Sequence, residues 1–165
     1  MKKYILLLFY VATIAFSCSE DNNSDDTPAE SDGLVGTWLL TDIRIDAGTN
    51  DDDLNFAKQI LGFLQGIDCE LITFTFNESG TLDTDSKVDH LSINVGTGGL
   101  DIPCPTEVDE ESALWVLNGD QLTISKEGEA DEAFTIELDG NTLIVPGESV
   151  DANNYAGADA VFTRQ

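Results

Sequence analysis

Apolar and polar residues alternate along most of the chain after residue 33, which is the pattern of half-buried β-strands. In the segment 69–77, for example, Ile72, Phe74 and Phe76 fall on one face. Turn residues at positions 77–80, 118–119 and 139–140 separate such runs. We therefore predict strands over residues 34–45, 69–77, 81–88, 90–95, 112–117, 121–125, 133–138, 142–145 and 160–164. Short strands joined by turns favour an antiparallel barrel or sandwich.

One segment departs from this pattern. Between the first two predicted strands, residues 51–66 carry apolar side chains at helical spacing, namely Leu54, Ala57, Ile60, Leu61 and Leu64. The three aspartates at 51–53 suit the first turn of a helix, where they cap free amides and complement the helix dipole. A helix is predicted here, and its apolar stripe must be buried against the strands.

The positions of the apolar residues also predict the register of the first strand. Trp38 and Leu40 share one parity in the first strand, whereas Ile43 and Ile45 share the other, so a bulge near residues 41–42 would turn all four inward. Parity also places His90 outward. Trp115 opposes Leu114 and Val116, so it is either an exposed contact residue or part of the core.

The start of the chain has a different character. Two lysines, an apolar run over residues 4–16 and Cys18 are followed by a polar, acidic stretch. This order describes a secretory signal, and a cysteine at the cut resembles the lipobox of bacterial lipoproteins. The resemblance implies a signal peptide over residues 1–17, acylation of Cys18, and an acidic flexible tether over 18–33 leading to a domain over 34–165. An ordinary signal peptide with an incidental cysteine is the alternative.

The residues after Cys18 refine the expected location. Ser19, Glu20 and Asp21 resemble the surface-export tag of Bacteroidetes lipoproteins, which implies an outer-membrane protein exposed on the cell surface. A solvated spacer that faces the periplasm is the alternative. The expected partner at this end is the lipid bilayer, through two or more acyl chains, because one chain alone holds a protein only marginally.

Charge excludes other partners. The chain carries 32 acidic and 7 basic residues, a net charge of −25. Nucleic acids and anionic head groups need basic groups to displace counterions, so neither is expected to bind. A charge of this size also keeps a protein in solution free of aggregates, and we expect a monomer.

Two cysteines remain if Cys18 carries lipid. Cys69 and Cys104 then form an even pair in an oxidising compartment, where disulfides persist. A bridge between them would stabilise the fold by about 3–4 kcal/mol in the chain-entropy model. Two unpaired thiols are the alternative.

A family resemblance enters at Gly36, Thr37 and Trp38, which match the Gly-x-Trp motif that opens the first strand of lipocalins. The phrase 34–40 and the later hairpins resemble the lipocalin-like domains of Bacteroidetes lipoproteins over most of residues 34–165. The resemblance implies an all-β, antiparallel up-and-down barrel of about eight strands, of the calycin kind. It also implies that Arg164 packs across Trp38 and closes one end, while the helix serves as lid or plug.

Catalytic and metal chemistry have little support in the sequence. His90 is the single histidine, and a nucleophilic triad needs such a base beside a Ser or Cys. The acidic stretch 83–89 fails the EF-hand pattern, because Val88 and Asn94 stand where glycine and glutamate are required. We expect no enzyme activity, no cofactor and no metal site.

The predicted function is a non-catalytic binding module for a small apolar or amphipathic ligand. Its expected lining is Phe74, Phe76, Leu122, Ile124, Phe134 and Ile136. Small barrels are also found packed solid. The alternative is therefore a surface scaffold with a filled core, which contacts protein or glycan through loops such as 96–107.

Overall fold

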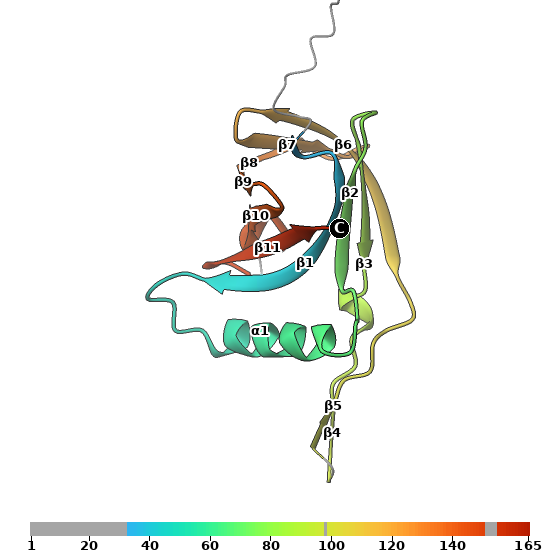
Figure 1. Cartoon of the computed structure of the whole chain (residues 1–165), viewed down its shortest axis with the longest axis vertical. Helices are drawn as coiled ribbons and strands as arrows, with labels where there is room; N and C mark the ends of the chain where they lie inside the picture. Colours follow the sequence, from blue (N-terminus) through green and yellow to red (C-terminus); the bar gives the residue numbers. More distant parts are fainter. Residues whose placement is uncertain (1–32, 98, 151–154) are drawn as a thin grey trace, which may run out of the picture.

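The computed structural model describes residues 33–97, 99–150 and 155–165 (Figure 1). The predicted signal peptide, Cys18 and the tether up to residue 32 lie outside the described residues. Within the described ranges, no helix has the length and apolar character needed to cross a membrane.

A single antiparallel sheet forms the wall of a nearly closed barrel, which confirms the predicted architecture (Figure 1). The order of strands around the wall is β8 (Glu132–Thr135), β7 (Gln121–Ser125), β6 (Asp109–Asn118), β3 (Thr81–Ser86), β2 (Ile72–Phe76), β1 (Gly36–Ile45), β11 (Ala158–Arg164), β10 (Thr142–Pro146) and β9 (Glu137–Asp139).

The two edges of this sheet belong to one stretch of chain. We predicted a single strand over residues 133–138, and the structure divides it at Ile136 into β8, which pairs with β7, and β9, which pairs with β10. Ile136 donates its backbone N–H to Asp120 O at 2.8 Å and is 3% exposed. Taken as one bent strand, residues 132–139 complete the barrel of about eight strands.

The predicted bulge in β1 is confirmed. Its pairing with β11 shifts between Leu40 and Asp42. As a result Trp38, Leu40 and Ile43 are all buried, and Ile45 is half-buried against the same core.

The predicted helix is confirmed as α1 (Asp52–Gln65). Asp51 caps it, because its carboxylate accepts hydrogen bonds from the backbone N–H groups of Asp53 at 2.9 Å and Leu54 at 3.1 Å. The helix lies across the end of the barrel where β1 finishes (Figure 1), and buries Leu54, Ile60, Leu61 and Leu64.

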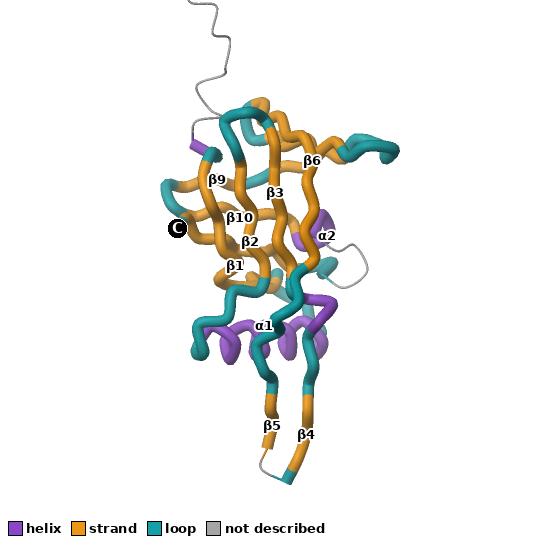
Figure 2. Tube along the Cα trace, turned by 90° about the vertical axis from the view of Figure 1, so that its right-hand side faces the viewer, coloured by secondary structure: helices purple, strands orange, loops and turns teal. Residues whose placement is uncertain are grey.

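The strand predicted over residues 90–95 is wrong. The chain instead forms a 3₁₀ turn, η2 (Val88–His90), and then a hairpin of β4 (Asn94–Gly96) and β5 (Gly99–Asp101). The hairpin projects beyond α1, away from the barrel (Figure 2). Alternation in this segment is real, but no core lies against it, since Ile93 is 43% and Val95 83% exposed.

A disulfide joins Cys69 to Cys104, with their Cα atoms 5.6 Å apart, so the predicted pairing is confirmed and the alternative of two thiols is excluded. Cys69 precedes β2, and Cys104 lies between the hairpin and β6. The bridge therefore ties the base of the projecting hairpin to the end of the barrel that α1 covers.

Candidate functional site

Aromatic rings fill one side of the barrel interior. Phe74 stacks on Phe162 with ring centroids 4.4 Å apart, and Phe76 meets Trp115 edge-on at 5.4 Å. Trp115 is 7% exposed and its Nε1–H donates to Thr81 O at 3.1 Å, so it belongs to the core and is no surface contact residue. These rings form a fixed floor for the space beside them.

Trp38 and Arg164 lie together at the end of the barrel opposite α1. The guanidinium carbon of Arg164 is 4.3 Å from the centroid of the Trp38 ring, a cation–π arrangement. The same guanidinium donates to Val35 O at 2.6 Å and to Gly33 O. Gly36 permits this approach, because its φ is +137° and a Cβ there would lie 2.7 Å from Arg164 Nη1. These contacts close this end of the barrel.

A cavity of about 950 Å³, open to solvent on one side, lies beside these rings. Of the side chains expected to line it, Phe74, Phe76, Leu122, Ile124 and Phe134 do so. Ile136 does not, and its inclusion was wrong. The bend between β8 and β9 turns it into the closed core, where it is almost fully buried.

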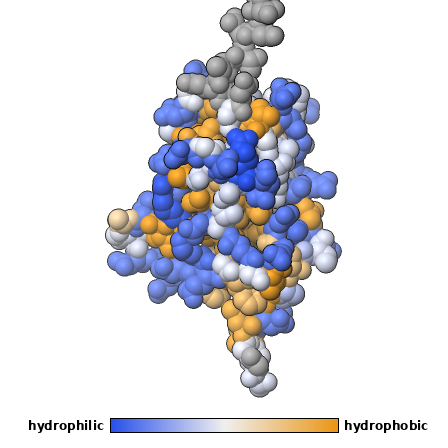
Figure 3. Space-filling model, viewed as in Figure 1, coloured by the Kyte–Doolittle hydropathy of each residue, from blue (hydrophilic) through white to orange (hydrophobic). Residues whose placement is uncertain are grey.

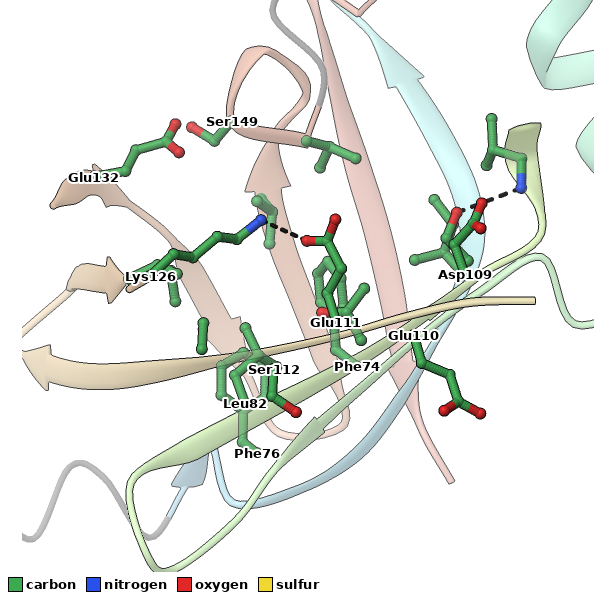
Figure 4. Close-up of a pocket in the computed structure, with 18 of the residues that line it drawn as sticks. Phe74, Phe76, Leu82, Asp109, Glu110, Glu111, Ser112, Lys126, Glu132 and Ser149 are labelled. Atoms are coloured by element: carbon green, nitrogen blue, oxygen red, sulfur yellow. Dashed lines mark hydrogen bonds and ion pairs between the residues drawn. The ribbon is translucent and has the colours of Figure 1, made fainter. Parts of the chain in front are cut away.

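The cavity opens through the wall of the barrel, where β6 extends beyond its shorter neighbour β7. Only the second half of β6, Leu114 to Asn118, pairs with β7. The first half, from Asp109, pairs with β3 alone. Ser149, which follows β10, and the ends of β7 and β8 flank the opening (Figure 4).

Strand parity turns carboxylates of β6 toward this opening. Successive side chains of a strand point to opposite faces. Trp115 points inward, so Ala113, Glu111 and Asp109 share its face, and all three line the cavity. In Figure 4, Glu110 points away from the group formed by Glu111, Lys126 and Glu132.

Lys126 is the one basic residue in the described part of the lining. Its Nζ lies 2.5 Å from Glu111 Oε2. This hydrogen bond raises the pKa of Lys126 above its ordinary value, and the charges of Glu129 and Glu132 act in the same direction. Lys126 therefore stays protonated at neutral pH and is already paired within the protein.

His90 lies between two carboxylates near the opening. Its Nδ1 is 3.3 Å from Glu107 and its Nε2 is 3.2 Å from Asp109. The side chain is 28% exposed, so the residue does not point fully outward as strand parity suggested, because it sits in η2 and not in a strand. Both ring nitrogens of His90 thus contact carboxylates, and neither of these two contacts is with a hydroxyl or thiol.

The acidic stretch 83–89 does not gather into a metal centre. Asp83 accepts hydrogen bonds from Ser112 Oγ at 2.6 Å and from Asn77 Nδ2 at 2.9 Å. These two bonds, that of Ser112 first, lower the pKa of the Asp83 carboxyl. Across residues 33–97, 99–150 and 155–165, no group of three or more His, Cys, Asp or Glu side chains is placed to hold a metal ion.

A second, smaller cavity of about 140 Å³ lies beneath α1. It is lined by apolar side chains from the helix and from β1, including Leu40, Ile43, Ile60 and Leu61. The helix therefore covers this end of the barrel with little space left below it.

The carboxylates at the opening were missed by the sequence prediction, which began the fifth strand at Ser112, whereas β6 begins at Asp109. The parity of the strand could have indicated them. Counting back from Trp115 in steps of two reaches Ala113, Glu111 and Asp109, and this places two acids on the inner face.

A family model described as a lipocalin-like domain matches residues 34–145. A search of curated proteins found no match. Among solved structures, a lipocalin-like protein from Bacteroides uniformis is 13% identical with a TM-score of 0.41, covering 81% of this chain and 99% of that chain. An uncharacterized protein from Bacteroides eggerthii is 14% identical with a TM-score of 0.40, covering 79% of this chain and 98% of that chain.

Proposed function

The chain belongs to the lipocalin-like domain family, and on that basis we propose that it is a non-catalytic binding module for a small apolar or amphipathic ligand. The observation that carries this proposal is the cavity of about 950 Å³ inside the barrel. Sites for small molecules are concave and about 300–1,000 Å³ in volume, a range that includes this cavity.

The lining suits such a ligand. Phe74, Leu122, Ile124 and Phe134 offer apolar surface on one side of the space, and carboxylates and hydroxyls stand at its opening. Apolar surface removed from water on binding contributes about 25 cal/mol per Å², so a ligand with an alkyl or ring body gains most of its affinity from this floor.

The test uses an apolar fluorescent dye, with two variants at neighbouring positions of β6. Ala113 points into the cavity, whereas Leu114 points outward and is 59% exposed. We expect saturable binding of one dye per chain to the unmodified protein and to Leu114→Trp. Ala113→Trp should place a large ring inside the cavity and weaken binding at least tenfold.

Two results would overturn the binding function. One is an absence of saturable binding by a protein that still unfolds cooperatively. The other is equal binding by Ala113→Trp and Leu114→Trp, which would place the dye on the outer surface.

The anchor is a separate part of the proposal. Lysines at positions 2 and 3, the apolar run and Cys18 support cleavage before Cys18 and acylation of that residue. The protein would then be held in the outer membrane by its acyl chains. In cells fed a labelled fatty acid, the intact chain should incorporate the label, whereas Cys18→Ser should not, and should leave the membrane fraction.

Exposure on the cell surface is supported by Ser19, Glu20 and Asp21. A protease added to intact cells should degrade the surface-exposed chain. Replacing these three residues with alanine should protect it, because the lipoprotein would then stay on the periplasmic face. Protection of the unmodified chain would favour the periplasmic location from the outset.

A second candidate function rests on the hairpin of β4 and β5. Val95 is 83%, Leu100 47% and Ile93 43% exposed, and Figure 3 shows apolar surface gathered at this projection. Exposed apolar surface of this kind is typical of contact sites for partner proteins. If the protein acts as a scaffold, Val95→Ser with Leu100→Ser should abolish capture of a partner without changing dye binding.

A further inference from the structure

We propose that the cavity selects ligands with a positively charged head group on an apolar body, such as an alkyl amine, over neutral or anionic molecules of the same size. This inference rests on the binding function proposed above and names its ligand class. It follows from the arrangement of charge and apolar surface within one cavity.

The first observation is the division of the lining. The apolar residues Leu122, Ile124 and Phe134 lie along β7 and β8, and continue into the aromatic floor. The charged residues lie at the opening in the wall. A molecule that uses both parts must itself have an apolar body and a polar head.

The second observation is the sign of the charge at the opening. Among the residues that the structure describes, the lining contains five acids, Asp89, Asp109, Glu110, Glu111 and Glu132, and one basic residue, Lys126. Glu111 and Lys126 neutralise one another at 2.5 Å. Even with Glu110 set aside because it points away, acidic charge remains in excess.

The third observation is that parity aims these acids at the cavity. Asp109 and Glu111 share the inner face of β6 with Ala113 and Trp115. Glu132 shares the inner face of β8 with Phe134, since both line the same space. Charged side chains on the inner face of a strand are costly unless water or a counter-charge meets them.

An anionic head would find Lys126, the basic group in the described lining, already paired with Glu111. To bind Lys126 it would have to displace Glu111, and the freed carboxylate would stand beside it. A cationic head meets acidic charge on either side of Glu111, from Glu132 on the side of Lys126 or from Asp109 on the other (Figure 4). The ring of His90, 3.2 Å from Asp109, shares that carboxylate without satisfying both of its oxygens.

The experiment measures displacement of an apolar dye by three probes that share one ten-carbon tail, namely decylamine, decanol and decanoate. At pH 7 the amine is a cation and the carboxylic acid an anion. Measurements at 0.15 M salt screen charges farther than about 8 Å away. We expect decylamine to bind about tenfold more tightly than decanol, since two exposed charge contacts each contribute a few-fold, and decanoate to bind most weakly.

A matched pair of double variants locates the preference. Asp109→Asn with Glu132→Gln removes two charges at the opening and should reduce the preference for decylamine over decanol to about twofold. Glu70→Gln with Glu78→Gln removes two exposed charges outside the cavity lining and should leave it near tenfold. The control variant, Glu70→Gln with Glu78→Gln, should also bind decanol like the unmodified protein.

The outcomes separate the two proposals. If no probe displaces the dye because nothing binds, the binding function itself fails. If decanol or decanoate binds as tightly as decylamine, the cavity binds ligands but the charge selectivity is wrong. Equal losses in the two double variants would assign the preference to the net charge of −25 and would overturn the selective role of the opening.

Discussion

Arg164 combines three contacts at the closed end of the barrel. Its guanidinium covers the ring of Trp38 and donates to two backbone carbonyls, those of Val35 and Gly33. One side chain thereby fixes the segment that leads into β1. Since the pair is part of the structural closure, its loss should change stability and not ligand binding.

We predict that Arg164→Ala lowers the free energy of unfolding by about 2–4 kcal/mol, because a cation–π contact and charge-assisted hydrogen bonds are lost together. Arg164→Lys should recover part of the loss, since lysine keeps the charge without the planar fork. Denaturant unfolding measures both changes.

Arg44→Ala is the control for this prediction. Arg44 forms exposed ion pairs with Asp159 at 2.8 Å and Glu137 at 3.4 Å, so its loss should cost less than about 1 kcal/mol. Equal effects at Arg44 and Arg164 would contradict the closing role of Arg164.

Asp83 supplies a prediction on pH. The Ser112 and Asn77 hydrogen bonds lower the pKa of the folded Asp83 carboxyl below its ordinary value of 3.8. A lowered folded pKa stabilises the protein above the unfolded pKa, and this contribution is lost as the pH falls through the folded pKa. Ser112→Ala should therefore destabilise the protein at pH 7, and its difference from the unmodified protein should shrink below pH 4.

The measurement is the denaturant midpoint from pH 7 to pH 3. Ser79→Ala is the control, because the Ser79 hydroxyl meets only the Thr81 hydroxyl, at 2.9 Å, and no charge is involved. A Ser112→Ala difference that stays constant with pH would contradict the role of the Asp83 charge.

At the scale of elements, the sequence was informative wherever a strand or helix faces the core on one side. The α1 stripe and the β1 bulge at residues 41–42 both followed from apolar spacing. The break at Ile136 did not, because Phe134, Ile136 and Leu138 keep perfect alternation through it. Alternation reports which residues share a face, and it does not report that the partner strand changes.

The prediction of a wall strand over residues 90–95 was wrong for a related reason. Ile93 and Val95 alternate like residues of a wall strand, but they pair only within the projecting hairpin. The acids at the opening were missed because nothing local in β6 reveals that its first half lacks a partner on one side. Pairing across a sheet is a property of the whole barrel, and short-range pattern does not contain it.

The disulfide is the element-scale link with the largest predicted effect. Cys69 and Cys104 are 35 positions apart, so the bridge restricts a long loop in the unfolded chain. We predict that a reductant lowers the free energy of unfolding by about 3–4 kcal/mol. The measurement is denaturant unfolding with and without reductant.

Cys69→Ala with Cys104→Ala should show a similar loss and no further response to the reductant. An unmodified protein whose unfolding does not change on reduction would contradict the stabilising role of the bridge.

At the scale of the whole molecule, the barrel is completed by one bent stretch of chain. Ile136 stands at that bend, buried between edges that belong to different parts of the sheet. We predict that Ile136→Ala lowers the free energy of unfolding by about 2–5 kcal/mol, as large-to-small changes in a core do. Leu138→Ala, at a half-buried position of β9, should cost about half as much or less.

Thermal and denaturant unfolding of the two variants checks this prediction. A smaller loss at Ile136 than at Leu138 would mean that the bend does not hold the edges together.

The unequal lengths of β6 and β7 have a kinetic meaning. Arg164 closes one end of the barrel and α1 covers the other. A ligand would therefore enter through the side wall, at the opening beside the first half of β6. Ligand exchange with solvent would then require neither end of the barrel to open. A rigid barrel held by a disulfide is therefore compatible with fast association and dissociation of a ligand.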